Sequence, residues 1–343
     1  MSSQITTRVL VTGATGFLGG NVLQALAAQP HVELIAACRN RHKLPPWFKG
    51  EVREGDLLNP AYRRELTRDT DVVCHAAAWA AMWGHAELER TRFFEPTVDL
   101  IEQSIGHGVK RFIQTSTVAV GKVRRDGAAH DDHSATQYTG FWPHLDRLID
   151  IENFMHANSH RGTQMVTLRL GHFIGKGNRL GLLPALVPRL RTYLVPWLAG
   201  GRKRMPLVAD TDLGHAFALA AVAENLNSYE SFNICGAAFP TMHEVVEFIV
   251  EETGFPKPLY SVPYSLGYAF GWLMEKLHPI LPGSSPFLTR SIVHLSEDWM
   301  CSNDSAQQKL GYVPQKDWRV AAREHLADLG AARYPWPRLA QAN

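Results

Sequence analysis

Residues 8–19 read Arg-Val-Leu-Val-Thr-Gly-Ala-Thr-Gly-Phe-Leu-Gly, an apolar run that passes into three glycines spaced three apart. The run predicts a short buried strand, and the spacing over Phe17–Ala28 predicts a helix. Gly13 would allow a tight turn, Gly16 would let a pyrophosphate approach backbone N–H groups, and Gly19 would let the helix pack closely on the sheet. This strand–turn–helix context favours a dinucleotide phosphate loop over a purely structural turn. The predicted cofactor contacts of the loop are Gly13, Thr15, Gly16, Phe17, Leu18 and Gly19.

The second predicted strand, Val32–Cys38, ends without the carboxylate that would hold a ribose 2′-hydroxyl. Arg39 stands there instead, with Arg41 or Lys43 nearby. A guanidinium suits the 2′-phosphate of NADP, so NADP is the expected cofactor and NAD is less favoured. The alternative is that these residues are solvated loop charges.

Strand-like and helix-like segments alternate along the first half of the chain. The predicted strands are 8–12, 32–38, 51–54, 71–75, 111–116 and 165–170, and the predicted helices are 17–28, 60–68, 87–107, with a possible break near Pro96, and 145–159. This alternation predicts βαβ units, and so an α/β fold with a Rossmann-type, doubly wound parallel sheet. After Gly171 the pattern becomes irregular. We expect an NADP-binding domain over 1–170, with later segments contributing, and a mainly substrate-binding region over 171–343.

The composition is that of an ordinary globular protein, because 45% of the 343 residues are hydrophobic and 20% are charged. The net charge of +2 indicates no nucleic-acid footprint. The sequence shows neither a signal peptide nor a spanning apolar run, so we expect a cytoplasmic protein. The four cysteines, Cys38, Cys74, Cys235 and Cys301, form no CxxC pair, so neither a zinc ribbon nor a dithiol site is expected. Their sparse use is typical of a reducing compartment.

Three further stretches follow the glycines: Gly-Asp-Leu at 55–57, His-Ala-Ala-Ala at 75–78 and Thr-Ser-Thr at 115–117. With the phosphate loop, this series resembles the extended short-chain dehydrogenase/reductase family, in the branch of NAD-dependent epimerases, dehydratases and 3β-hydroxysteroid dehydrogenases. The resemblance continues through 168–170, Gly175, 208–213 and 310–314, and so spans nearly the whole chain. The Trp-Gly pair at 83–84 looks most like bacterial reductases of the 3β-hydroxysteroid-dehydrogenase type, which take bulky apolar substrates.

The resemblance implies roles for particular residues. Asp56 and Leu57 should contact the adenine, and Thr117 or its neighbour Ser116 should bond the substrate oxygen. The residues expected along the far side of the cofactor are Ala76, Ala77 and Ala78. The family also implies a homodimer, in which the helices predicted at 87–107 and 145–159 pair with their mates.

The chain departs from the family at the residues that do the chemistry. The family uses a tyrosine and a lysine four residues apart on one helix face; the lysine holds the nicotinamide ribose and the tyrosine moves the proton. The only tyrosine in this region is Tyr138, and Trp142 stands four residues later.

The register of that helix can be counted from its other end. The family usually has a glutamate eight residues after the tyrosine and an arginine about 17 residues after the glutamate, and Glu152 and Arg169 keep this spacing. The count assigns His144 to the tyrosine position and Leu148 to the lysine position. Leucine cannot hydrogen-bond a ribose.

His144 is the candidate acid–base group, because histidine exchanges protons near neutral pH. The alternative is a structural histidine with no chemical role. Arg147 lies three residues further along the helix and could supply the missing positive charge, or could simply be solvated. Tyr138 is a lesser candidate.

Two other sets of residues are weaker. The quartet 130–133, His-Asp-Asp-His, has metal-ligand residue types, but consecutive residues rarely converge on one ion, so no metal is expected. Trp79, Met82, Trp83 and Trp142 could line an apolar substrate pocket or could belong to the core.

Two functions remain open from the sequence. The first is an NADP-dependent oxidoreductase acting on a carbonyl or hydroxyl of a bulky apolar molecule, with a variant that has moved to isomerase, lyase or cyclase chemistry. The second is a non-catalytic NADP(H) sensor. The hydroxyls at 115–117 and His144 favour an enzyme, whereas the missing tyrosine and lysine favour the sensor or the non-redox variant.

Overall fold

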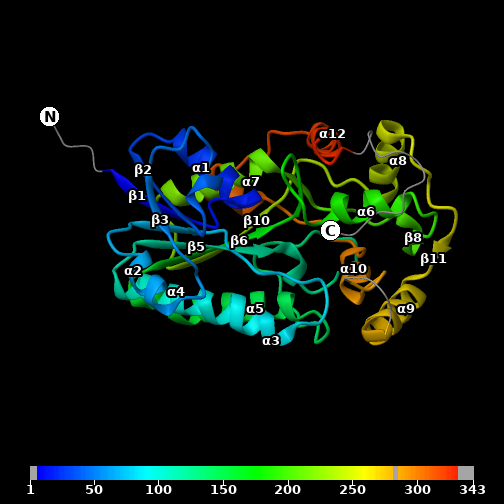
Figure 1. Cartoon of the computed structure of the whole chain (residues 1–343), viewed down its shortest axis with the longest axis horizontal. Helices are drawn as coiled ribbons and strands as arrows, with labels where there is room; N and C mark the ends of the chain where they lie inside the picture. Colours follow the sequence, from blue (N-terminus) through cyan, green and yellow to red (C-terminus); the bar gives the residue numbers. More distant parts are fainter. Residues whose placement is uncertain (1–5, 125, 281–284, 331–343) are drawn as a thin grey trace.

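A computed structural model describes residues 6–124, 126–280 and 285–330 of the chain. A parallel β-sheet lies between two layers of helices, and the remaining short strands and helices gather at one end of the molecule (Figure 1). The prediction of an α/β Rossmann-type fold is confirmed.

The central sheet of the described residues has seven strands. They are β1 (Thr7–Thr12), β2 (Val32–Cys38), β3 (Glu51–Glu54), β4 (Val72–His75), β5 (Arg111–Thr117), β6 (Gln164–Leu170) and β10 (Tyr229–Ile234). Their order is β10-β6-β5-β4-β1-β2-β3, and all neighbours run parallel. The strand order reverses between β1 and β4. Open α/β sheets bind ligands beyond the carboxyl ends of the strands at such a switch point.

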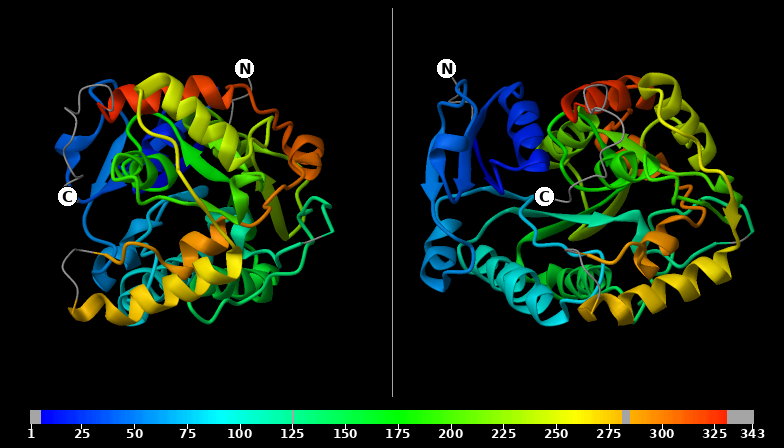
Figure 2. Two further views of the ribbon diagram at one scale, coloured as in Figure 1. Left: turned by 90° about the vertical axis from the view of Figure 1, so that its right-hand side faces the viewer. Right: turned by 45° about the vertical axis from the view of Figure 1, so that its right-hand side comes forward.

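Helices cover both faces of the sheet (Figure 2). The α-helices of the described residues, those at the end of the molecule included, are α1 (Phe17–Ala27), α2 (Pro60–Leu66), α3 (Ala86–Glu89), α4 (Glu95–Gly106), α5 (Pro143–Asn158), α6 (Leu182–Leu190), α7 (Asp210–Val222), α8 (Met242–Thr253), α9 (Tyr264–Leu277), α10 (Arg290–Leu295), α11 (Asp304–Leu310) and α12 (Trp318–Asp328). Successive strand residues point to opposite faces. Val9 and Val11 therefore pack with α1 and α7, whereas Leu10 belongs to the core formed with α4 and α5.

The second half of the chain contributes to both regions. β10 and α7 follow residue 171 but belong to the central layers. The remainder includes two small sheets, β7 (His172–Ile174) with β9 (Leu207–Ala209) and β8 (Trp197–Leu198) with β11 (Ser261–Val262). Helix α8 begins with a capping box formed by Thr241 and Glu244.

The helix predicted over 87–107 is not uniform. A π-helical turn, η2 (Arg90–Phe94), separates α3 from α4. Pro96 lies in the first turn of α4, where the missing N–H does least harm, and the irregular turn comes just before it.

No CxxC pair is present, but two of the cysteines that lie far apart in the sequence are bonded to each other. Cys235 and Cys301 form a disulfide across 66 residues of sequence. The fold brings them together because β10 ends beside the segment before α11, where Asn303 Nδ2 donates to the Cys235 carbonyl oxygen over 2.9 Å. None of the described helices is long and apolar enough to span a bilayer.

Candidate active site

The loop between β1 and α1 forms a backbone cradle at the switch point of the sheet. Gly13 has a φ of +65°, and a Cβ there would lie 2.9 Å from the backbone N and Cα of Ala77. The Gly16 N–H donates to the Gly13 carbonyl oxygen over 2.8 Å and closes the turn. A Cβ on Gly19 would collide with the same carbonyl oxygen. Close backbone approach therefore requires glycine at positions 13 and 19.

The first turn of α1 is open to an anion. Gly16 is the N-cap, no side chain of the described residues bonds the first-turn N–H groups, and the turn has no acidic residue. Unpaired N–H groups and the helix dipole attract negative charge, so a dinucleotide pyrophosphate fits this cradle. Thr15 is half-buried and Phe17 packs on Phe173, with ring centroids 6.2 Å apart. Leu18 is buried, so it can offer only its backbone N–H.

The residues after β2 leave one guanidinium available. Arg41 is engaged by Glu54, with Nε 2.8 Å from Oε2. Arg39 is exposed and makes no hydrogen bond or ion pair with any residue that the structure describes. Arg39 is therefore free to meet an anionic group beside β2.

The other residues expected to contact the cofactor lie at the carboxyl ends of β3 and β4. The exposed Asp56 carboxylate accepts a hydrogen bond from the Leu58 N–H over 2.9 Å, and Leu57 is half-buried. The residues that follow β4 directly are Ala76, Ala77 and Ala78. Since a Cβ on Gly13 would meet Ala77, this segment forms the wall of the phosphate loop.

A buried histidine ties β1, β4 and α4 together beneath this loop. His75 Nδ1 lies 2.8 Å from Thr12 Oγ1, and Nε2 lies 3.2 Å from Thr97 Oγ1. Thr12 Oγ1 also accepts a hydrogen bond from the Ala77 N–H over 3.3 Å. Complete burial lowers the pKa of His75 to about 4. The ring is therefore neutral, and each nitrogen is matched by a hydroxyl that can donate or accept.

Ser116 belongs to a buried polar network. Its Oγ donates to Glu152 Oε1 over 2.6 Å, and Arg169 Nη2 lies 2.7 Å from the other oxygen of Glu152. The ion pair joins α5 to β6, which gives a physical reason for the spacing from which the helix register was counted. Because the Ser116 hydroxyl is buried and already bonded, it is poorly placed to bind a substrate.

Thr117 is the last residue of β5, and its hydroxyl proton has no acceptor among the described residues. Strand alternation turns its side chain to the face opposite Ser116. Its Oγ1 accepts a hydrogen bond from the Ala119 N–H over 3.3 Å, at the start of the 3₁₀ turn η3 (Val118–Val120), and the side chain is half-buried. A hydroxyl that accepts one bond can still donate its own proton. Thr117 is therefore the better suited of the two to bond a substrate oxygen.

His144, in the first turn of α5, is bound to a buried carboxylate. Its Nδ1 lies 3.0 Å from Oε2 of Glu89, whose side chain is 0% exposed. The second oxygen of Glu89 accepts from the Ala81 N–H over 2.8 Å, and the Phe93 ring lies against the imidazole with centroids 5.0 Å apart. Within the described part of the chain, Nε2 of His144 makes no hydrogen bond. A carboxylate at Nδ1 keeps the proton there and leaves Nε2 for a reactant.

Glu89 is a residue that the sequence reasoning missed. It lies 55 positions before His144, so no local spacing rule connects the two. It is the last residue of α3, directly before the π-helical turn η2, and such turns are frequent at functional sites. Trp142 Nε1 donates to the Ala81 carbonyl oxygen over 2.9 Å. The segment after β4 is therefore tied to the beginning of α5 both through Glu89 and through Trp142.

Three other candidates near α5 have different surroundings from His144. Leu148 is 5% exposed and packs in the core. Tyr138 Oη donates to Asp150 Oδ1 over 2.8 Å, and Arg147 pairs with the same carboxylate at 2.8 Å. Partial burial and the bond to Asp150 raise the pKa of Tyr138. A tyrosine that exchanges a proton near neutrality needs the opposite shift.

The segment between η3 and α5, described over residues 121–124 and 126–142, is held against the body of the protein. The His130 ring stacks on Trp299 with centroids 5.6 Å apart, and the Asp132 carboxylate accepts from the Asn233 N–H. Burial lowers the pKa of His130 and raises that of Asp132. Among the residues described, no three metal-ligating side chains converge.

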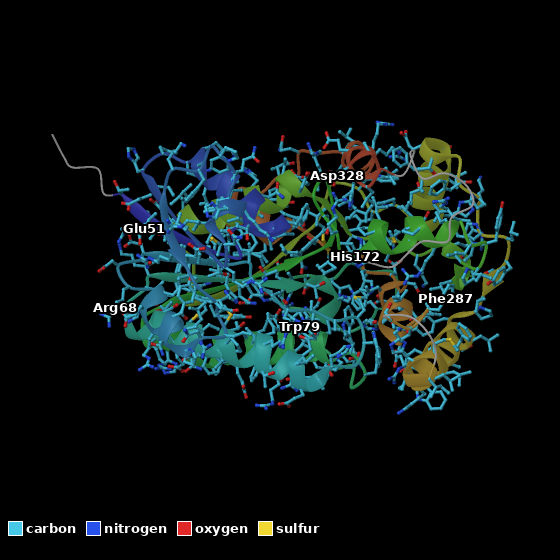
Figure 3. All side chains as sticks on the ribbon, in the orientation of Figure 1. Glu51, Arg68, Trp79, His172, Phe287 and Asp328 are labelled. Atoms are coloured by element: carbon cyan, nitrogen blue, oxygen red, sulfur yellow. A yellow bond between two sulfur atoms is a disulfide. The ribbon has the colours of Figure 1, made fainter. Side chains whose placement is uncertain are left out.

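Aromatic side chains gather on the segment after β4. Trp83 lies against His85 and His278, with ring centroids 5.2 Å and 4.6 Å away, and Trp79 meets His85 at 6.0 Å. Figure 3 shows Trp79 near the middle of the molecule, over the helical layer that contains α5. Met82 is 38% exposed. This segment thus presents apolar surface next to the tie between Ala81 and Glu89.

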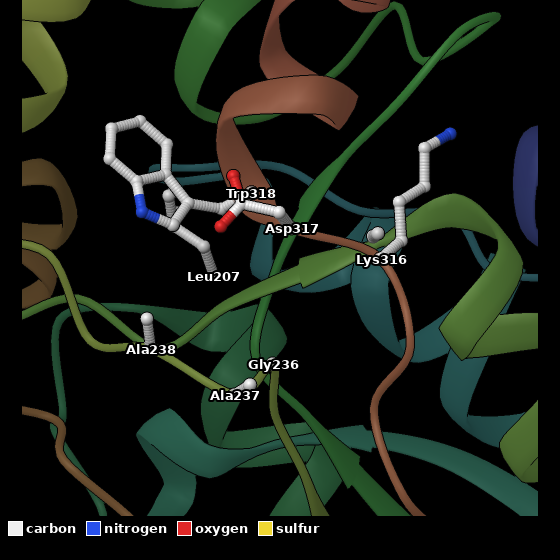
Figure 4. A pocket seen from close by; sticks show the side chains of 8 residues that line it. Leu207, Gly236, Ala237, Ala238, Lys316, Asp317 and Trp318 are labelled. Atoms are coloured by element: carbon white, nitrogen blue, oxygen red, sulfur yellow. The ribbon is translucent and has the colours of Figure 1, made fainter.

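A small cavity lies between β9 and the beginning of α12. Figure 4 shows Trp318 and Lys316 on one side of it and the backbone of 236–238 on the other. Its volume of about 20 Å³ is enough for a water molecule but not for a cofactor or substrate. None of its lining residues belongs to the candidate set.

The chain is similar to several known proteins along most of its length. The chain is 25% identical over 339 residues to 2-alkyl-3-oxoalkanoate reductase of Stenotrophomonas maltophilia, covering 95% of this chain and 99% of that protein. It is 26% identical over 341 residues to the 3 beta-hydroxysteroid dehydrogenase/Delta 5→4-isomerase of Mycobacterium tuberculosis, covering 93% and 89%. The UDP-glucose 4-epimerase of Thermus thermophilus, solved with NAD, shares the fold with a TM-score of 0.70 and 20% identity, covering 95% and 100%. The phosphate loop, the sheet order and a profile match over residues 9–235 show that this chain belongs to the NAD dependent epimerase/dehydratase family.

Proposed function

We propose that this protein is an NADP-dependent reductase or dehydrogenase that acts on a carbonyl or hydroxyl group of a bulky, mostly apolar small molecule. The pair formed by His144 and Glu89 carries the proposal. It supplies an oriented acid–base group at the helix position where the family resemblance expects a tyrosine.

In this proposal a nicotinamide cofactor at the phosphate loop supplies or accepts the hydride. Thr117 donates a hydrogen bond to the substrate oxygen. In the reductive direction, Nε2 of His144 gives that oxygen its proton. Glu89 holds the opposite ring nitrogen and stabilises the imidazolium before the transfer. Positioned proton transfer of this kind contributes about 10²–10⁴-fold in rate.

The preference for NADP rests on Arg39. Its guanidinium is exposed and unpaired within the described residues, whereas Arg41 is held by Glu54. A guanidinium can bond a 2′-phosphate, but gains little from a ribose hydroxyl. Several solved neighbours of the same fold contain NAD, so the preference rests on this chain's own residues.

An apolar substrate is supported by two independent observations. Trp79, Met82 and Trp83 lie on the segment that is tied to Glu89 through Ala81. Relatives that align over most of the chain are named for 2-alkyl-3-oxoalkanoates and for 3 beta-hydroxysteroids, both largely hydrocarbon molecules.

A non-redox isomerase, lyase or cyclase, or a non-catalytic NADP(H) sensor, is the second candidate. The observation that favours it is Leu148, a core residue at the position where the resemblance expects a lysine. Arg147 does not obviously replace that lysine, because Asp150 binds its guanidinium.

The proposal also includes the domain division, the localisation and the oligomeric state of the protein. Residues 1–170 form the NADP-binding domain with help from later segments, and 171–343 mainly bind substrate. The protein is cytoplasmic and forms a homodimer through α4 and α5.

Two substitutions test the proposal. His144→Phe should lower kcat by about 10²–10⁴-fold, and Glu89→Gln by roughly 10–100-fold, because the ring loses its anionic partner. NADPH oxidation with a long-chain 2-alkyl-3-oxoalkanoate or a 3-oxosteroid gives the rates, and fluorescence titration should show NADPH affinity within about twofold of the wild type. Glu87→Gln is the matched control, since Glu87 lies on the same helix but is exposed.

Full activity in His144→Phe would reject His144 as the proton donor. NADPH binding by the wild type, with no turnover of either compound or its reduced form, would favour the sensor or the non-redox alternative.

A further inference from the structure

Helix α9 turns its large apolar side chains to solvent. Leu266, Phe270 and Leu273 recur at helical spacing and are 61%, 43% and 41% exposed, and Trp272 beside them is 47% exposed. Residues three and four apart share one face of a helix. A surface helix of a globular protein normally points such a face toward the core.

The inward side of α9 shows why the apolar face of this helix points to solvent. A Cβ on Gly267 would lie 3.1 Å from the Leu198 side chain, and one on Gly271 would lie 3.0 Å from the carbonyl carbon of Thr289. The helix therefore packs closely through glycines. Glu275 also faces inward, where it pairs with Arg290 at 2.6 Å and is only 10% exposed. Two glycines, Glu275 and Tyr268, which meets the Phe141 ring at 5.6 Å, make the inward contacts. The exposed large apolar side chains of the helix are Leu266, Phe270, Trp272 and Leu273.

The apolar surface continues beyond the helix. Tyr260 Oη donates to the Leu194 carbonyl oxygen over 2.8 Å, which joins the segment before α9 to the segment before β8. The exposed apolar side chains of these two segments are Tyr193, Leu194, Leu259 and Tyr260. Figure 2 shows α9 along the outside of the molecule, at the end away from β1–β3. None of the large exposed apolar side chains of the described residues lies on α4 or α5, so this surface is separate from the expected dimer helices.

The surroundings of this surface are basic. An open hollow of about 470 Å³ lies beside it on β8 and β11, lined by Trp197, Gly200, Arg202, His243 and Ser261. Arg202, Lys203 and Lys276 form no ion pair within the described part of the chain. Stretches 177–208 and 254–274 contain no Asp or Glu.

Two acidic side chains close to this surface already form ion pairs. Glu247 pairs with Lys257 at 3.0 Å and lies 3.5 Å from His243, at the edge of the hollow. Glu275 is held by Arg290, as described above. Glu251 of α8 is exposed and has no ion pair within the described residues, so Arg202, Lys203 and Lys276 outnumber it and the surface complements a negatively charged partner.

We propose that α9 and the adjoining hollow dock on a bilayer surface rich in anionic lipids. Leu266, Phe270, Trp272 and Leu273 enter the boundary between headgroups and acyl chains, with the helix lying in the plane of the interface. Arg202, Lys203 and Lys276 meet the lipid phosphates. Aromatic and aliphatic residues on one face, with lysine and arginine beside them, are the composition of interfacial helices, and juxtamembrane cations add affinity for anionic headgroups. The inference does not depend on the reaction that the protein catalyses.

Vesicle co-sedimentation of the full chain tests the proposal without any turnover. The protein should bind vesicles of equal parts phosphatidylcholine and phosphatidylglycerol, bind pure phosphatidylcholine vesicles at least about tenfold more weakly, and lose affinity as salt rises. A triple variant with Leu266→Gln, Phe270→Gln and Leu273→Gln should lower the partition coefficient at least about tenfold. Each of Arg202→Gln, Lys203→Gln and Lys276→Gln should lower it up to about fivefold.

The matched control changes apolar residues of similar exposure elsewhere, Val222→Gln, Val313→Gln and Val320→Gln, and should bind vesicles like the wild type. Absence of binding to the anionic vesicles would overturn the proposal, as would equal binding by the α9 triple variant. Sedimentation velocity without vesicles supplies the third arm. A dimer that the α9 triple variant dissociates would assign this face to a second copy of the chain instead.

Discussion

The beginnings of α1 and α5 are both candidate parts of the active site, but they are built differently. The candidate site at α1 is built from backbone groups. Glycines at positions 13 and 19 let neighbouring backbone segments approach closely, and no side chain of the described residues caps the first-turn N–H groups. The candidate site at α5 is built from a side chain, that of His144. His144 depends on Glu89 from α3, which in turn accepts from the backbone of Ala81.

Under the proposed function, this difference accounts for a chain that keeps the glycine loop of the family and has a histidine where the resemblance expects a tyrosine. A backbone cradle depends on conformations that only glycine adopts cheaply, so it resists change. A side-chain acid–base group needs only a suitable proton affinity and a partner that orients it. Histidine with a buried glutamate can therefore stand at a tyrosine position, provided that the fold brings the glutamate there.

Among effects on cofactor binding and stability, the largest is expected from a substitution in the backbone cradle. Gly13→Ala should weaken NADPH binding at least about hundredfold, because alanine is strained at a φ of +65° and its Cβ would press on the backbone of Ala77. Fluorescence titration measures the change. Gly20→Ala is the matched control, since its Cβ would meet only ordinary contact at 3.9 Å and should leave affinity within about twofold. Wild-type affinity in Gly13→Ala would show that the loop is not a phosphate site.

A second prediction concerns the support beneath the cradle and its dependence on pH. The unfolded chain exposes His75 with an ordinary pKa of about 6.5, whereas the folded state holds that pKa at about 4. Below pH 6.5 or so, protons bind the unfolded state first, so stability present at neutral pH is lost as the pH falls toward 4. The contribution of His75 to this loss between pH 7 and pH 4.5 is about 2–3 kcal/mol.

Urea unfolding of the wild type and of His75→Gln at several pH values measures this term. The variant lacks the site, so its free energy of unfolding should fall less steeply with acid. His172, whose pKa burial also lowers to about 4, remains in both proteins and its contribution cancels in the comparison. Parallel curves for the two proteins would contradict the assignment.

The smallest expected effect is on cofactor choice. Arg39→Ser should raise the Kd for NADPH about tenfold and leave NADH binding unchanged, because the guanidinium bonds only the 2′-phosphate. Arg41→Ser is the control, since Glu54 already engages that side chain. If the wild type binds both cofactors equally, Arg39 is only a solvated charge.

Local sequence was enough to predict the parallel α/β fold and the tight glycine turn after β1. These features depend on neighbours within a few residues, through the apolar periodicity and the glycine spacing. The sequence also offered a way to count the register of α5, because Glu152 and Arg169, whose spacing was used for the count, form an ion pair.

Only the tertiary structure decided which of the two hydroxyls is buried in a polar network and which acid contacts His144. Strand alternation and the packing of α5 direct the Ser116 side chain into a buried polar network. Among the described residues, the Thr117 hydroxyl only accepts a hydrogen bond and can still donate its proton. The fold likewise joins Glu89 to His144 and Cys235 to Cys301, over 55 and 66 residues of chain. Such contacts have no period and no fixed spacing in the sequence, because they are set by how separate elements pack and not by the backbone geometry of any one of them.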